Sequence, residues 1–247
     1  MVNPLFYEHI LPVDSAAHRK LKVGAAPQPY AFARSANLIP ALIEEFSAAA
    51  PYMPIAFLPG ADKPAAVFVT GLKPGENLFV RPDGTWNAGY LPAYLRRYPF
   101  IMGDVPEGQP ILCIDGSFEG LGEGNALFAE SGEPSAFLTQ ALTLAENYRL
   151  GAQRSDAFCM KLQQLRLFRS VTLDARQPDG QSVVVHGLMV VDEDVLNQLP
   201  EPDLVGLQQS GYLRPIYAHL LSLGALPRLS EQLKAAKTRL QGLAPEF

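Results

Sequence analysis

The sequence predicts an α+β fold, with a mostly antiparallel sheet of short hairpin strands and helices grouped in the C-terminal half. Short apolar runs separated by turns rich in glycine and proline occupy much of the first half, which favours strands. Two further pairs of apolar runs flank polar loops and are typical of antiparallel hairpins. The long segments with helical spacing begin beyond residue 133. This grouping differs from the strict alternation of a doubly wound α/β fold.

A proline-rich arm forms the first 30 residues, because each proline interrupts a helix. We expect this arm to lie along the rest of the domain and to pair partly as a strand. Its prolines are Pro4, Pro12, Pro27 and Pro29.

Residues 37–49 predict an amphipathic helix, since their apolar side chains recur at helical spacing. Asn37 is the expected N-cap, and Pro40 lies in the first turn, where its missing N–H costs little. Short apolar runs bounded by turn residues follow and predict strands. These strands are expected at 54–58, 65–72 and 77–80.

A second short helix is predicted over 87–97, with Pro92 in its first turn. Two antiparallel hairpins are predicted from paired apolar runs on either side of a polar loop. One hairpin joins 98–102 to 110–115, and the other joins 171–175 to 182–191.

Residues 133–170 have the strongest helical pattern, and Ser135 is a suitable N-cap. A break near Gly151 is expected to divide this segment into two helices. Glycine lowers helix stability, and the polar pair Ser155 and Asp156, a few residues later, could start a second helix.

The last quarter of the chain also predicts helices. Asp192 is expected to begin a short capped helix, because acidic residues favour a helix start. Residues 202–223 continue as a helix that Pro215 either kinks or restarts. An amphipathic tail over 229–247 is expected to lie on the surface.

Length and composition place the chain among globular proteins. The 247 residues are 48% hydrophobic, enough for a substantial core, and we expect one domain over residues 1–247. The formal charge of -5 argues against nucleic-acid binding, which usually requires a basic face. No apolar run reaches the roughly 18 residues that a membrane span requires, so none is expected.

The two cysteines, Cys113 and Cys159, lie in apolar surroundings and are expected to be reduced core residues. The N-terminus shows neither a basic region nor a continuous apolar stretch of the kind found in classical signal peptides. A cytoplasmic protein is therefore expected. The alternative is a cell-surface location reached by a non-classical export route.

The stretch from 86 to 128 holds the only tryptophan, two adjacent arginines among aromatic residues and a glycine-rich acidic loop. Arginine and large aromatic side chains dominate binding hot spots, because they combine apolar area with directed hydrogen bonds. One arginine is expected to form a structural ion pair, for example with Asp115 or Glu119. The arginines could therefore brace the structure or bind a ligand, and both roles stay open. The predicted ligand-binding residues are Trp86, Tyr90, Tyr94, Arg96, Arg97, Asp115 and Glu119.

Between Arg97 and Arg149 the chain contains acidic residues and no lysine or arginine. Such a segment could face a cationic partner or a metal, or form a solvated acidic face. A protein or peptide partner, or a second copy of this chain, would fit this pattern.

The glycine-rich loop after residue 114 allows three interpretations. A dinucleotide fingerprint requires a third glycine where Leu127 stands, and no phosphate-loop lysine follows. A calcium loop requires a glutamate where Ala126 stands. A turn-rich connection between a strand and a helix explains the glycines best. No cofactor is predicted.

Weak metal candidates also follow from residue type, since two histidines and a carboxylate hold non-haem iron in some enzymes. The local pairing of histidine with carboxylate that such sites show is missing here. The candidates are Asp115, Glu119, His186 and His219.

Four blocks of the sequence together carry a family resemblance. They are WNAGYLPAYLRRYPF, ILCID, ALFAESGEPSAFL and IYAHLLSLGALPRL. With them, the chain from about residue 7 to residue 229 resembles the bacterial SapC family. The family name implies association with a surface layer, and the resemblance supplies no catalytic residues to transfer.

These observations predict a non-enzymatic binding or accessory protein that recognises a peptide, a carboxylate-bearing ligand or a protein partner. Two alternatives stay open. One is a metal-dependent enzyme, with non-haem iron or a similar metal. The other is a self-assembling surface-layer component, which would form homo-oligomers.

Overall fold

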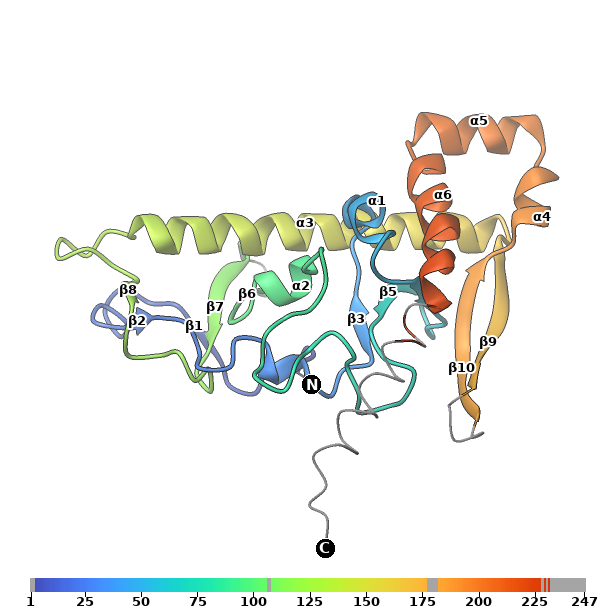
Figure 1. Cartoon of the computed structure of the whole chain (residues 1–247). Coiled ribbons are helices and arrows are strands. Elements are labelled where there is room, and N and C mark those ends of the chain that lie inside the picture. Colours follow the sequence, from blue (N-terminus) through green and yellow to red (C-terminus); the bar gives the residue numbers. More distant parts are fainter. Residues whose placement is uncertain (1–2, 106–107, 177–181, 228, 230, 232–247) are drawn as a thin grey trace, which may run out of the picture.

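The computed structural model describes residues 3–105, 108–176, 182–227, 229 and 231, which form an α+β fold (Figure 1). The strands are β1 (Ile10–Pro12), β2 (Lys22–Val23), β3 (Leu38–Pro40), β4 (Ile55–Leu58), β5 (Ala65–Val69), β6 (Phe100–Gly103), β7 (Ile111–Asp115), β8 (Asn125–Ala126), β9 (Phe168–Arg176) and β10 (Ser182–Val191). The helices are α1 (Phe46–Ala49), α2 (Ala93–Arg96), α3 (Ala136–Gln164), α4 (Glu193–Asn197), α5 (Glu201–Gln209) and α6 (Leu213–Ser222). Three 3-10 turns are η1 (Ala31–Ala33), η2 (Ile43–Glu45) and η3 (Leu223–Ala225).

The described strands form three antiparallel sheets. The largest has the order β3-β5-β4-β10-β9, a second has the order β1-β7-β6, and β2 pairs with β8. Both predicted hairpins are confirmed, since β6 pairs with β7 and β9 pairs with β10. The predicted strands at 54–58 and 65–72 are confirmed as β4 and β5, which pair with each other.

Helix α3 runs along the whole molecule and joins its parts (Figure 1). Its 29 residues span about 43 Å at the usual rise per residue. As predicted, Ser135 caps it, and its Oγ accepts a hydrogen bond from the N–H of Leu138 at 3.1 Å. Leu138 packs into the core beside β6 and β7, Tyr148 into a middle cluster, and Phe158 into the core of the five-stranded sheet.

The predicted break of this helix near Gly151 is wrong, because α3 is continuous through that residue. Gly151 is buried, and a Cβ atom there would lie 2.9 Å from Cδ1 of Leu42. The glycine therefore permits close packing rather than ending the helix. Ser155, one turn later, donates to the carbonyl of Gly151 and accepts the N–H of Ile43 at 3.0 Å.

The N-terminal arm pairs as strands, as predicted. Strand β1 lies against β7, with Ile10 opposite Asp115, and β2 lies against β8. The arm thereby becomes an edge of one sheet, and its residues before β1 lie next to the loop that follows β7.

The predicted helix over 37–49 is largely wrong. Leu38–Pro40 form the edge strand β3, whose partner is β5, and helical backbone begins only at Ile43. In β3 the backbone N–H and C=O groups form hydrogen bonds with β5 in place of the helical hydrogen bonds that the apolar spacing predicted. Pro40 is tolerated because an edge strand has one side without partners.

Two further predictions are corrected around residue 86. Residues 77–80 form no strand, since Asn77 turns the chain by accepting the N–H of Phe79 and donating to the carbonyl of Ala33. Within the predicted helix 87–97, only Ala93–Arg96 are helical, and Pro92 is the residue before the helix.

The C-terminal helices follow the sequence signals closely. The Asp192 carboxylate caps α4 by accepting the N–H groups of Asp194 and Val195. Two helices, α5 and α6, replace the single helix predicted over 202–223, because Gly211 adopts a φ of 72° between them. Pro215 lies in the first turn of α6. Apart from Leu229 and Glu231, the predicted tail lies outside the described residues.

Both cysteines are buried and free, as predicted. Burial raises the pKa of the Cys159 thiol to about 12 and also raises that of Cys113, so both thiols stay protonated at neutral pH. The sequence prediction of reduced core residues is confirmed.

Candidate functional site

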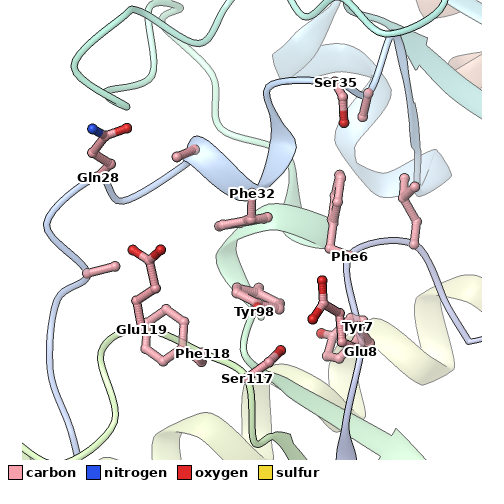
Figure 2. Close-up of a pocket in the computed structure, with 14 residues that line it drawn as sticks. Phe6, Tyr7, Glu8, Gln28, Phe32, Ser35, Tyr98, Ser117, Phe118 and Glu119 are labelled. Atoms are coloured by element: carbon pink, nitrogen blue, oxygen red, sulfur yellow. The ribbon is translucent and has the colours of Figure 1, made fainter.

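Three adjoining cavities surround the side chains of Tyr98 and Phe118, which line all three. Their volumes are about 690, 330 and 230 Å³. Tyr98 directly precedes the β6–β7 hairpin and Phe118 follows it, so the hairpin brings the two rings together, with centroids 5.5 Å apart. The largest cavity lies between the N-terminal arm, the segment around η1 and the loop after β7 (Figure 2).

The largest cavity has a wall of aromatic rings (Figure 2). The Phe32 ring lies 4.2 Å from Tyr98 and 5.1 Å from Phe6, between centroids, and Phe118 extends the wall beyond Tyr98. Each ring comes from a different segment of the chain. We call this cavity the aromatic–acidic pocket, and its defining residues are Phe6, Glu8, Phe32, Tyr98, Phe118 and Glu119.

Two carboxylates, Glu8 and Glu119, border the aromatic–acidic pocket. Figure 2 shows them on either side of the Phe32 and Tyr98 rings. Among the described residues, no lysine or arginine lines the pocket, and neither carboxylate forms an ion pair. Both side chains are exposed. The pocket therefore presents negative charge beside the faces of aromatic rings.

Asp115 is the anchor of this pocket rather than one of its lining residues. Its side chain is 0% exposed and accepts the backbone N–H groups of Glu8, His9 and Ser117, each at 3.0 Å. It also accepts the Ser117 hydroxyl at 2.7 Å and the Tyr98 hydroxyl at 3.3 Å. Burial by itself raises the pKa of Asp115, but these hydrogen bonds outweigh it and hold the pKa below its ordinary value.

Arg97 lies inside a cage of tyrosines. Its guanidinium carbon is 4.0 Å from the ring centroid of Tyr148, 4.4 Å from that of Tyr94 and 5.6 Å from that of Tyr7. The residue is 7% exposed, and its Nε has no hydrogen-bond partner. Burial raises the pKa of each tyrosine, with a smaller opposing effect from Arg97, so the cage is uncharged at neutral pH.

Arg96 points elsewhere, toward Glu45. Its Nη2 lies 3.8 Å from Glu45 Oε1 and 3.5 Å from the Tyr90 hydroxyl. Glu45 is 4% exposed and accepts the Tyr90 hydroxyl at 2.7 Å and the backbone N–H of Ala93 at 2.6 Å. Burial raises the pKa of Glu45, and these contacts offset part of the rise. The predicted ion pair of one arginine is therefore confirmed, but its partner is Glu45 and not Asp115 or Glu119, which were given as examples.

Arg96 and Arg97 both line the 330 Å³ cavity, which we call the basic pocket. Its other walls are formed by apolar residues of α3 and by the segment around β6. Its defining residues are Arg96, Arg97, Phe137 and Ala141. Arg96 also lines the 230 Å³ cavity, whose described lining contains no acidic residue.

Of the remaining predicted ligand-binding residues, Tyr94 is buried, and Trp86 and Tyr90 are half-buried and pack against the core. The Trp86 indole N–H donates to the carbonyl of Tyr90 at 2.7 Å, and its ring stacks on Phe79 at 5.5 Å. The Tyr94 hydroxyl donates to the carbonyl of Leu5 at 3.0 Å. Within the described residues, Trp86, Tyr90 and Tyr94 line none of the three cavities.

The four metal candidates do not come together. His219 is 0% exposed, its Nε2 accepts the N–H of Val191 at 3.0 Å, and its Nδ1 lies 3.0 Å from the carbonyl of Ile55. His186 is exposed on β10 and lies 3.4 Å from Thr172 Oγ1. In the described part of the chain, no group of three or more histidine, cysteine, aspartate or glutamate residues could hold a metal ion.

The residues that sequence reasoning missed are the aromatic ones at the centre of the site and Glu8. Phe6, Glu8 and Phe32 belong to the arm and to η1, far from the 86–128 stretch. The sequence predicted that the arm pairs partly as a strand, but it did not identify the hairpin strand β7 as the partner. Glu119 is the one predicted residue that lines the aromatic–acidic pocket, while Arg96 and Arg97 line the basic pocket.

None of the described helices is both long and apolar enough to cross a membrane. Neither the curated proteins nor the solved structures contain a match to this chain. The sequence model of the SapC family matches residues 13–229, which cover most of the chain. The protein therefore belongs to the SapC family.

Proposed function

We propose that this protein is a non-enzymatic binding protein whose aromatic–acidic pocket holds a positively charged side chain of a peptide or protein partner. One observation supports this proposal above the others. Two carboxylates without basic partners among the described residues stand beside a wall of aromatic rings. A lysine or arginine side chain complements both features.

Two attractions contribute to the binding of a cation in this pocket, one from the aromatic faces and one from the carboxylates. A cation over an aromatic face gains about 0.5–1 kcal/mol at an exposed site and about 2 kcal/mol when desolvated. Glu8 and Glu119 add electrostatic attraction without first losing a partner, because they are unpaired within the described residues. Their backbone positions are set by Asp115, through Glu8 and Ser117, so the pocket is largely formed before a partner binds.

The size of the pocket favours a chain segment over a small amine. A cavity of about 690 Å³ lies in the range of ligand pockets that enclose a drug-sized group. A lysine side chain uses its aliphatic stem against Phe6 and Phe32 and its ammonium group near the carboxylates. A peptide or protein partner supplies such a side chain on an extended backbone, in keeping with an accessory role.

The experiment is a binding titration with a blocked Gly-Lys-Gly peptide, compared with a blocked Gly-norleucine-Gly peptide that lacks the charge. The double variant Glu8→Gln/Glu119→Gln is expected to bind the lysine peptide at least about tenfold more weakly. The matched control is Glu123→Gln/Glu130→Gln, which removes the same charge from exposed residues outside the pocket. This control is expected to bind like the unmodified protein.

Two results would overturn the proposal. Equal affinity for the lysine and norleucine peptides would show that charge is not recognised. Equal losses in the two double variants would show that only overall charge matters, because both variants change it by the same amount. A further variant, Phe32→Leu, is expected to weaken binding severalfold through the loss of a ring face.

A further inference from the structure

Arg97 presents a charge that its surroundings do not neutralise. Among the described residues it forms no ion pair, although it is 7% exposed, and its Nε has no hydrogen-bond partner. A buried charge without a counter-charge is costly, and native proteins usually pair it. Three tyrosine faces compensate part of this cost, since they attract the cation, but they accept no hydrogen bond from Nε.

Arg97 is one of the residues that line the basic pocket. The described lining of this cavity contains no acidic residue. The rest of the wall is mostly apolar, with Phe100, Phe118 and Phe137 among its residues. Arg96 also lines the cavity, but it lies 3.8 Å from Glu45, so Arg97 is the cation there that lacks an ion pair among the described residues. An unpaired arginine in the wall of a mostly apolar cavity favours an anion with an apolar body.

We propose that the basic pocket is a second binding site, which takes the carboxylate of an aliphatic or aromatic acid, with Arg97 as its anchor. The carboxylate would provide the counter-charge that Arg97 lacks within the described residues. The apolar part of the acid would lie against Phe137 and Ala141. This site goes beyond the function proposed above, because a negatively charged group binds here and a positively charged group binds in the aromatic–acidic pocket.

A carboxylate fits this pocket better than a phosphate. The planar guanidinium matches a planar carboxylate with two parallel hydrogen bonds. Phosphate sites usually add several backbone N–H donors from a helix N-terminus or a glycine-rich loop. Here α3 presents Phe137, Gln140, Ala141 and Leu144 to the cavity, and the walls offer mainly carbon.

The test observes the guanidinium directly. The ¹H–¹⁵N signals of the Arg97 side chain, assigned by their loss in Arg97→Lys, are followed while isovalerate is added to the unmodified protein. Isovalerate is expected to shift these signals saturably. Isovaleramide, which has the same shape without the charge, and inorganic phosphate are expected to leave them nearly unchanged.

Two variants locate the site. Ala141→Phe fills the cavity from α3 while Arg97 stays in place, and it is expected to weaken isovalerate binding at least about tenfold. Ala157→Phe, at an exposed position of the same helix outside the cavity, is the matched control and is expected to have no effect. Glu8→Gln/Glu119→Gln is also expected to bind isovalerate normally, which separates this site from the aromatic–acidic pocket.

Three outcomes would overturn the proposal. If the guanidinium signals stay unchanged at high isovalerate concentration, Arg97 has only a structural role. Equal shifts with phosphate would reduce the site to general anion attraction. Equal binding by Ala141→Phe and Ala157→Phe would place the acid elsewhere on the molecule.

Discussion

Asp115 Oδ2 accepts a hydrogen bond from the backbone N–H of Glu8 at 3.0 Å, across 107 residues of sequence. The same carboxylate holds Ser117, two residues before Glu119. One buried side chain thus positions the backbone beside both carboxylates of the aromatic–acidic pocket. The arm and the loop after β7 depend on each other through this group.

The first prediction concerns this anchor. Asp115→Ala leaves the N–H groups of Glu8, His9 and Ser117 without their acceptor, so the free energy of unfolding is expected to fall by about 3 kcal/mol. Denaturant unfolding measures this change, and hydrogen exchange should become faster at the same three amides. The control Asp62→Ala removes an exposed carboxylate and is expected to change stability by less than about 0.5 kcal/mol. Equal stability of the two variants would contradict the anchoring role.

The second prediction compares two glycines within helices. Replacing glycine by alanine in an open helical position stabilises a helix by about 1 kcal/mol. Gly206 in α5 has nothing within 4 Å of an added Cβ, so Gly206→Ala is expected to stabilise the protein by about that amount. Gly151 in α3 has Leu42 Cδ1 at 2.9 Å, so the gain in Gly151→Ala is expected to be cancelled by displacement of Leu42.

Thermal unfolding of both glycine variants, measured side by side, checks this difference. Gly151→Val, which adds further bulk against Leu42, is expected to be destabilised by about 2 kcal/mol. Equal stabilisation of Gly151→Ala and Gly206→Ala would show that α3 does not need close approach at residue 151.

The third prediction is a pH dependence that arises from His219. Burial lowers the pKa of its imidazole from 6.5 to about 4, so the folded state binds fewer protons than the unfolded state between these values. The contribution of neutral His219 to the free energy of unfolding is therefore fully present above pH 6.5, and it is lost as the pH falls toward 4. The loss is of the order of 3 kcal/mol.

Denaturant unfolding across this pH range tests the prediction in the unmodified protein and in His219→Gln. The variant is expected to be less stable at pH 7, because the hydrogen bonds to Val191 and Ile55 are disturbed, and to lose less stability on acidification. Asp115, with its lowered pKa, acts in the same direction in both proteins and therefore does not confound the comparison. Parallel pH profiles would assign the effect to other groups.

The fourth prediction concerns the Arg96–Glu45 contact. Burial raises the pKa of Glu45, and Arg96 opposes that rise through its charge, so Arg96→Gln is expected to raise the pKa further. A raised carboxyl pKa means that the folded state binds more protons, so stability falls as the pH rises through the interval above 4.5. A carboxyl-carbon NMR titration of Glu45 measures the shift. Arg34→Gln, an exposed arginine that contacts Gln28 and Pro82 instead, is the control.

Local signals in the sequence predicted a large part of the fold. Ser135 and Asp192 cap helices because a short polar side chain reaches the free N–H groups of the first turn, whatever the rest of the chain does. Both hairpins were predicted for a similar reason, since the two strands and the loop are adjacent in sequence. The prolines kept the arm from forming a long helix and left it free to pair as β1 and β2.

The errors occurred where a distant partner decides the local structure. Residues 38–40 have helical spacing but pair with β5, and Gly151 looks like a helix breaker but makes room for Leu42. The surroundings of the candidate site also depend on distant partners. The sequence predicted a binding surface in the 86–128 stretch, which stays a prediction, and the structure packs Trp86 against Phe79 and Tyr94 against the arm.

The fold class, the hairpins, the caps of α3 and α4, the buried cysteines and the membership of the SapC family could all be predicted from the sequence. Each of these depends on residues that are close in sequence or on whole-chain similarity. Two arrangements became visible only in the folded chain: Glu8 lines the same cavity as Glu119, and Arg97 lies within a cage of tyrosines. Those arrangements join segments that are far apart in sequence, and a single hydrogen-bonded carboxylate, Asp115, fixes one of them across 107 residues. No periodicity or spacing encodes such a contact.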